Sequence, residues 1–211
     1  MASSSPQATR HRTPSLELTG LVIAAALRII GSEGIDAVTV RRLAAEADVA
    51  PMSIYNRFGD MNGVFDAVFH HGFTVFAEHL RASDSTVDPV LDLHRMGKVY
   101  RVFAIENPDL YRFMFLTPMD DLEPSAESSF AAAQAFDALH NVVIRSLDSK
   151  RFRPGNASVI AQQIWATCHG AVALELLGMS EFADVNETYD ALLVTLLRGL
   201  LRNPEESVEL A

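Results

Sequence analysis

The chain has a single cysteine, Cys168, among 211 residues, and this scarcity excludes any disulfide bond within the chain. It also lacks a charged-then-apolar leader segment, and no stretch reaches the roughly eighteen consecutive apolar residues that suggest a membrane-spanning helix. We therefore expect no membrane segment and a reducing cytoplasm as the compartment. Apolar residues make up 49% of the chain, which is sufficient for a hydrophobic core without covalent cross-links.

Motifs of common enzymes are missing as well. The sequence contains no Gly-x-Gly-x-x-Gly, P-loop, Gly-x-Ser-x-Gly or His-Glu-x-x-His pattern. His70 and His71 are neighbours, so on a helix they point about 100° apart and do not easily share a metal ion. His94, His140 and His169 are the set that can converge on zinc or iron. We expect no enzyme, no cofactor and no metal, with a metal-responsive regulator as the alternative.

An excess of positive charge, typical of nucleic-acid binders, is absent from the chain as a whole, whose net charge is −10. The distribution is uneven, because residues 1–60 hold six Lys or Arg and six Asp or Glu. The remaining residues therefore carry all of the net negative charge. This pattern allows a neutral first part to approach phosphate groups while the acidic remainder is repelled by them.

Alternating strand patterns are also absent, since no segment alternates over more than four residues, and we find no internal repeat. Residues 1–15 are rich in Ser and Pro and predict a disordered basic tail, which either touches a DNA groove or is simply unstructured. The sequence predicts an all-α fold. A polar run at 81–89 marks a domain boundary, and five helices are expected after it, at 89–107, 108–116, 124–149, 156–178 and 186–202.

The segment at 39–58, "TVRRLAAEADVAPMSIYNRF", holds two short apolar-periodic runs separated by a tight break. Thr39 can cap the first helix, Asp48 tolerates the left-handed backbone of a turn, and Pro51 suits the first position of the second helix. This is the plan of a helix-turn-helix, whose second helix enters the major groove of DNA. The apolar positions expected to lock the two helices in place are Leu43, Ala44, Val49, Ile54 and Phe58.

The side chains expected on the outer face of this segment combine phosphate donors with small groups that can face a DNA groove. Among them Arg41 offers the planar fork that matches guanine O6 and N7. A solvated arginine on an ordinary three-helix bundle is the alternative interpretation. The candidate DNA-binding residues are Thr39, Arg41, Arg42, Pro51, Met52, Ser53, Tyr55, Asn56 and Arg57.

The stretch "VIAAALRIIGSEGIDAVTVRRLAAEADVAPMSIYNRFGDMNGVFDAV", at roughly 21–68, resembles the N-terminal DNA-binding region of TetR-type transcriptional regulators. The resemblance implies a homodimer in which residues 16–60 read DNA, 61–82 form a connecting helix and 83–211 bind a small molecule and dimerise. It also implies that Thr39 and Tyr55 hold phosphates, that Arg41 reaches into the groove, and that Met52 and Ser53 face base edges.

Residues 94–119 are rich in aromatic and methionine side chains, which line adaptable pockets but also fill ordinary cores. Further along, "WATCHGAVALELLG" resembles the Trp-x-x-x-His-Gly subgroup of TetR-type C-terminal domains. Trp165 and His169 are four residues apart and share one helix face, either at a pocket or within the core. The candidate ligand-binding residues are Phe103, Tyr111, Met114, Trp165 and His169.

The late apolar runs at 157–178 and 186–202 predict the dimer interface, because their leucine stripe is too wide for one contact within the chain. We expect a repressor that binds a partly palindromic operator, with half-sites roughly 34–36 Å apart. A largely apolar molecule, oriented by one or two polar groups such as His169 or Tyr111, is expected to release it. The alternative is a ligand-independent DNA-binding protein with a solid C-terminal core.

Overall fold

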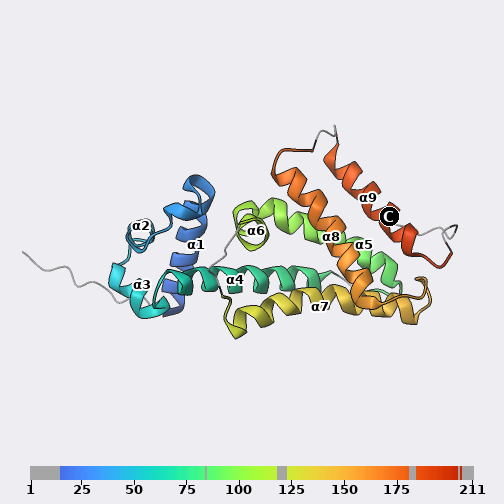
Figure 1. The fold of residues 1–211 in the computed structure, drawn as a ribbon, viewed down its shortest axis with the longest axis horizontal. Coiled ribbons are helices and arrows are strands. Elements are labelled where there is room, and N and C mark those ends of the chain that lie inside the picture. The colour runs from blue at the N-terminus through green and yellow to red at the C-terminus, as the bar shows by residue number, and fades with distance from the viewer. Residues whose placement is uncertain (1–14, 84, 118–122, 181–183, 204, 206–211) are drawn as a thin grey trace, which may run out of the picture. The chain divides into compact units, whose positions relative to one another are not determined.

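A computed structural model of the protein describes residues 15–83, 85–117, 123–180, 184–203 and 205. The described residues form α-helices, one short 3-10 helix and a single isolated bridge between Phe152 and Leu201, so the predicted all-α fold is confirmed (Figure 1). They divide into two compact units between Ala67 and Val68. None of their helices is long and apolar enough to cross a membrane. The predicted basic tail, apart from Ser15, lies outside the described residues.

The first unit is built from α1 (Ser15–Glu33), η1 (Ile35–Ala37), α2 (Val40–Glu46), α3 (Pro51–Phe58) and the first residues of α4 (Met61–Ala82). Helix α1 presents Val22, Ala25, Ala26 and Ile29 at helical spacing, and all four are fully buried. The helix ends before Gly34, whose φ of 87° is readily available only to glycine. Helices α2 and α3 both pack on α1.

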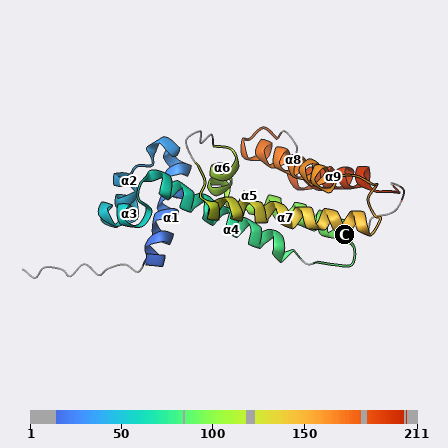
Figure 2. The ribbon, with the colours of Figure 1, turned by 60° about the horizontal axis from the view of Figure 1, so that its bottom comes forward.

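The second unit surrounds α5 (Pro89–Glu106) with α6 (Pro108–Phe115), α7 (Ala126–Asp148), α8 (Ala157–Leu176) and α9 (Val185–Leu200), which all contact it. Buried residues are found around most of the circumference of α5, as expected for a helix in the middle of a core. Gly97 allows a close approach, since a Cβ added there would come within 2.7 Å of Leu193 on α9. Helices α8 and α9 lie side by side (Figure 2).

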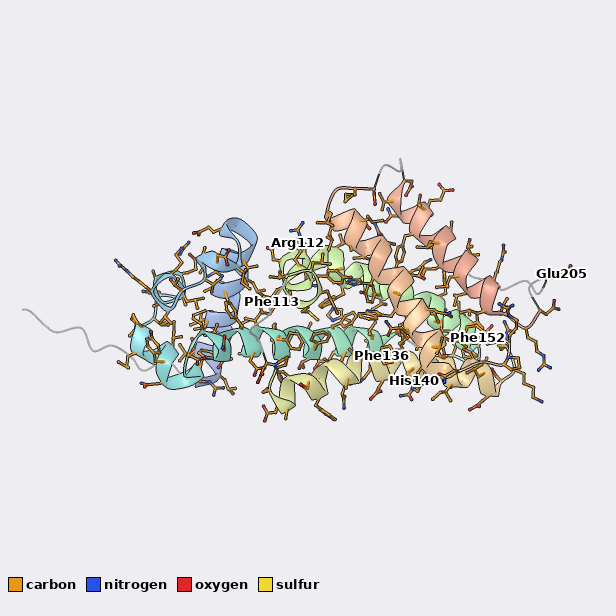
Figure 3. The ribbon with its side chains drawn as sticks, in the orientation of Figure 1. Arg112, Phe113, Phe136, His140, Phe152 and Glu205 are labelled. Carbon is orange, nitrogen blue, oxygen red and sulfur yellow. The ribbon has the colours of Figure 1, made fainter. Side chains whose placement is uncertain are left out.

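Polar contacts fix the ends of these helices. Asp88 caps α5 by accepting from the Val90 amide, and Asn156 and Asp184 cap α8 and α9 in the same way. The loop after α7 is joined to the end of α9, because the Arg153 amide donates to the Leu200 carbonyl at 3.0 Å. Phe152 lies at this junction and is buried (Figure 3). The five helices expected after residue 89 all occur, with bounds within two residues of those predicted.

Candidate functional site

Two short helices in the first unit form a helix-turn-helix. Thr39 begins α2 with its hydroxyl oxygen accepting from the Arg42 amide at 3.2 Å. Asp48 takes a left-handed φ of 52° in the turn, as its residue type allows, and α3 begins at Pro51 without a side-chain cap. Leu43, Ala44 and Ile54 are buried, whereas Val49 and Phe58 are half-buried. The apolar positions therefore fix the two helices and leave the opposite face open.

That open face carries the candidate DNA-binding residues. Met52 is 65% exposed and Tyr55 49% exposed, so both side chains are open to a partner. Only Ser53 and Arg42 are half-buried, and the remaining exposed members of the set are Thr39, Arg41, Pro51, Asn56 and Arg57. The arrangement presents phenol, amide and guanidinium donors on one surface of α2 and α3, which suits phosphate and base edges.

The arginines of this face differ in their partners. Arg42 donates to Glu33 at 2.7 Å and to Glu46 at 2.9 Å, and Arg28 also pairs with Glu46. The hydrogen bond to Glu33, followed by that to Glu46, raises the pKa of Arg42. Arg42 therefore braces α1 against α2. Within the described part of the chain Arg41 has no hydrogen bond or ion pair, so its guanidinium is available for a partner.

Arg57 is only partly engaged within the chain. Its Nε donates to the Thr19 hydroxyl at 2.9 Å, and its guanidinium lies 5.9 Å from the centre of the Phe58 ring. These contacts hold the stem of the side chain against the first unit. Within the described residues its other guanidinium nitrogens make no hydrogen bond or ion pair, so they remain available for a partner.

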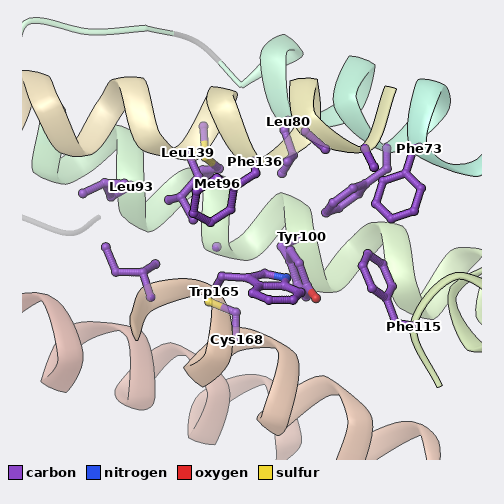
Figure 4. Close-up of a pocket in the computed structure, with 15 residues that line it drawn as sticks. Phe73, Leu80, Leu93, Met96, Tyr100, Phe115, Phe136, Leu139, Trp165 and Cys168 are labelled. Atoms are coloured by element: carbon purple, nitrogen blue, oxygen red, sulfur yellow. The ribbon is translucent and has the colours of Figure 1, made fainter. Parts of the chain in front are cut away.

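A cavity of about 320 Å³ lies inside the second unit, between α4, α5, α7 and α8 and against Phe115 at the end of α6 (Figure 4). Its wall is almost wholly carbon. The residues that line it are Phe73, Phe76, Leu80, Leu93, Met96, Gly97, Tyr100, Phe115, Ala132, Ala135, Phe136, Leu139, Ile164, Trp165 and Cys168. The volume falls within the range of small-molecule pockets in proteins.

Beside the cavity, three polar side chains bond to each other. The hydroxyls of Tyr100 and Tyr111 are 2.7 Å apart, and Nδ1 of His169 lies 2.7 Å from the Tyr111 hydroxyl and 3.2 Å from that of Tyr100. Burial raises the pKa of both tyrosines and lowers the pKa of His169, so all three groups are neutral near pH 7. A neutral His169 accepts at Nδ1, and the hydroxyls supply the protons.

The candidate ligand-binding residues separate into two groups. Trp165 lines the cavity, whereas Tyr111 and His169 belong to the polar cluster behind Tyr100. Phe103 is fully buried and Met114 nearly so, and neither is among the lining residues. Sequence reasoning missed most of the wall. In the sequence, Phe73 and Phe76 have the spacing of any buried helix face, and the Ala-rich run of α7 gives no sign of a cavity beside Ala132 and Ala135.

The three histidines considered for a metal do not converge. His94 Nε2 lies 2.9 Å from Asp190, His140 Nε2 lies 3.2 Å from the Ser158 hydroxyl, and His169 belongs to the tyrosine cluster. Among the described residues no group of three His, Cys, Asp or Glu side chains is arranged to hold a metal ion. Cys168 is buried in the cavity wall, and burial raises the pKa of its thiol, which leaves it unreactive.

An exposed helix-turn-helix joined to a larger helical unit with an apolar cavity defines a DNA-binding regulator. Sequence comparison agrees with this class: the family described as bacterial regulatory proteins, tetR family, matches residues 22–68, and the tetracyclin repressor-like C-terminal domain matches 93–196. The chain belongs to the TetR family of transcriptional regulators, which is not a class of enzymes and whose members bind operator DNA and form dimers.

Individual relatives are distant. An uncharacterized helix-turn-helix transcriptional regulator of Mycobacterium tuberculosis, Rv0681, is 26% identical over 86% of this chain and 80% of its own length. A protein of unknown function from Rhodococcus sp. RHA1 superposes with a TM-score of 0.78 at 25% identity, covering 93% of this chain and all of the other. The fatty acid degradation regulator FadR of Bacillus halodurans gives 0.75 at 17% identity, over 90% and 98%, which shows a common fold.

The lowered pKa of His169 predicts loss of stability in mild acid. The unfolded chain protonates this histidine near pH 6.5, whereas the folded chain protonates it only at lower pH. The contribution of His169 to the free energy of unfolding is therefore complete above about pH 6.5, and it declines as the pH falls from there through the lowered pKa. Burial lowers the pKa of His71 and His94 as well, so they act in the same direction. Each histidine adds at most about 1.4 kcal/mol per pH unit to the slope.

His169→Asn tests this account, because its amide oxygen can still accept from Tyr111 but does not titrate. Urea unfolding measured from pH 7.5 downward should give a shallower acid slope for this variant than for the wild type. His140→Asn removes a histidine from elsewhere in the same unit and serves as the control. Equal slopes for His169→Asn and the wild type would contradict the assignment.

Proposed function

We propose that the protein is a homodimeric repressor that leaves its operator when a small, largely apolar molecule enters the cavity of the second unit. The cavity is the observation that carries this proposal, because its volume and almost wholly apolar wall match those of small-molecule sites. Residues 16–60 would read DNA, 61–82 would connect and 83–211 would bind ligand and dimerise. A regulator of this kind works in the cytoplasm, where bacterial DNA is found.

In the DNA complex, α3 would lie in the major groove. Thr39 and Tyr55 would hold phosphates on either side of it, and Arg41 would reach a base edge or a phosphate, since it is exposed and has no partner among the described residues. Met52 and Ser53 face outward on the first turn of α3, where a groove-binding helix contacts bases. The pairing of Arg42 with two carboxylates favours a bracing role, with any contact to phosphate secondary.

Helix α4 supplies the means of release. It runs without interruption from Met61 to Ala82, so one helix contributes both to the first unit and to the cavity wall, through Phe73, Phe76 and Leu80. A ligand that binds better when α4 is displaced favours dimers whose two helix-turn-helix units are wrongly spaced for the operator.

The segment around Trp165, His169 and Gly170 would place the chain in the Trp-x-x-x-His-Gly subgroup.

Dimerisation would use α8 and α9. Val159 and Leu174 on α8 are 54% and 48% exposed, and Leu177 just beyond the helix is also exposed. Gly170 lies on the exposed side of α8, where an added Cβ would meet nothing within 4 Å. On α9, Leu193 and Leu197 are buried within the chain, while Leu192, Leu196 and Leu200 remain partly exposed. Together these faces would form a four-helix bundle across a two-fold axis.

Arg41→Ala and Arg42→Ala should have different effects. The first should weaken binding to a DNA site selected by the wild-type protein from a random pool and lower the salt slope by about one, without changing stability. The second should mainly reduce the stability of the first unit, and only slightly, because its ion pairs are at the surface. Fluorescence anisotropy over a range of salt concentrations and urea unfolding measure the two quantities. Unchanged affinity of Arg41→Ala would contradict its proposed role.

The double variant Val159→Glu/Leu174→Glu should be monomeric, because charges would have to be buried at the two-fold axis. Val102→Glu/Ile105→Glu makes the same change on α5, at side chains that are 47% and 41% exposed, and should remain dimeric. Sedimentation velocity measures the mass of each, with circular dichroism to check folding. A dimeric α8 variant would place the interface elsewhere.

Operator release tests the function as a whole. Molecules that raise the melting temperature in a screen of apolar compounds should weaken DNA affinity, with a coupling factor typically between about 5 and 150. The same factor must appear when DNA is present and ligand binding is titrated, because coupling is reciprocal. If every stabilising compound left DNA affinity unchanged, the ligand-independent alternative would replace the repressor model.

A further inference from the structure

The wall of the cavity shows which chemical class of ligand it accepts. We infer that the cavity binds an uncharged, hydrocarbon-like molecule of about thirteen non-hydrogen atoms and provides no anchor for a carboxylate, phosphate or ammonium group. This inference rests on the proposed function only in taking the cavity as the effector site. It goes further by excluding ligands recognised through an ion pair.

The charge of the wall is zero. None of its fifteen residues is Asp, Glu, Lys, Arg or His. An ionised ligand that enters such a space loses its hydration and gains no partner, which costs far more than apolar contact returns. The ion pairs of this unit lie elsewhere: Arg101 is paired with Glu175, and Arg145 with Asp92. A charged group on the ligand therefore meets no counter-ion in the wall.

The few polar atoms of the wall are already in use. The Tyr100 hydroxyl bonds to Tyr111 and His169. It also interacts with Trp165, and this interaction lowers the pKa of Tyr100, although burial raises that pKa by more. The two rings lie together at one side of the cavity in Figure 4. The hydroxyl protons of the two tyrosines are donated within the cluster, where the neutral ring of His169 offers one acceptor nitrogen. A strongly polar ligand would have to break this cluster to be satisfied.

Volume sets the size of the ligand. An apolar cavity of roughly 150 Å³ in another protein holds benzene, which corresponds to about 25 Å³ for each non-hydrogen atom. A cavity of about 320 Å³ then holds about thirteen such atoms. Two aromatic rings fit this number, and the wall favours them: Phe76 meets Tyr100 and Phe115 edge-on at 5.3 and 5.9 Å, and a ligand ring can join the same arrangement.

The test compares two probes with one skeleton, 4-methylbiphenyl and biphenyl-4-carboxylate. Trp165 is the only tryptophan of the chain and lines the cavity, so quenching of its fluorescence reports binding by the full-length protein without DNA. At pH 7 the carboxylate should bind roughly 10²–10³-fold more weakly, because it can enter only after protonation from a pKa of about 4.3. Its affinity should rise about tenfold for each pH unit of acidification.

The hydrocarbon probe controls for titration of the protein, since any change of charge near the cavity, such as that of His169 behind Tyr100, affects both arms equally. Ala135→Leu should fill part of the cavity and weaken 4-methylbiphenyl at least tenfold. Ala133→Leu adds the same side chain two residues away at an exposed position of α7 and should bind like the wild type. Circular dichroism confirms that both variants fold.

Three results would overturn the inference: equal or tighter binding of the carboxylate at pH 7, an affinity for it that does not change with pH, or undiminished binding of 4-methylbiphenyl by Ala135→Leu. The proposed function fails separately. If 4-methylbiphenyl bound as expected while DNA affinity stayed the same, the ligand class would stand and operator release would not. If the carboxylate bound more tightly and released DNA, the repressor would stand and the ligand class would be wrong.

Discussion

Burial of most of α5 is the constraint on which the second unit depends. Helices α6, α7, α8 and α9 contact it, as does Phe76 of α4, so the polar groups on its buried sides have to be satisfied inside the protein. Tyr100 bonds to Tyr111 and His169, buried Asp92 accepts from Thr86 and Arg145, and the Gly97 carbonyl accepts from Tyr189. These bonds hold the surrounding helices at fixed positions. Between α5 and α7 the side chains of Ala132 and Ala135 are too small to fill the space that results, and a cavity remains.

The first unit solves a different problem, which is to expose large side chains without losing its fold. Its core depends on small and branched residues such as Ala25, Ala26 and Ile29, which bring the helices close together. Arg28 and Arg42 pair with carboxylates across α1 and α2 and so neutralise positive charge beside the reading surface. Under the proposed DNA-binding mode, affinity would then depend on few cations. This agrees with the net charge of −10, since most of the acidic groups lie after residue 60.

The helices were predictable because their signals are local. Thr39 as a cap, Asp48 in the turn and Pro51 at the start of α3 each act within a few residues, and all are found as expected. The 3-10 helix at Ile35–Ala37 was not predicted, since three residues show no periodicity. The cavity was not predictable either. An empty space depends on which side chains from five helices meet, and aromatic residues follow the same spacing whether they fill a core or line a void.

The cavity also explains why ligand binding alone does not produce regulation. Filling an apolar void stabilises the second unit whatever the position of α4, and a ligand that stabilises two conformations equally shifts nothing. Coupling requires that the fit differ between them. Phe73, Phe76 and Leu80 make α4 part of the wall, and the same helix begins in the first unit at Met61. Under the proposed mechanism, a ligand too large for the cavity as it stands would press on α4. The difference in fit, and with it the response, would then increase with ligand size up to the point where the unit no longer closed around the ligand.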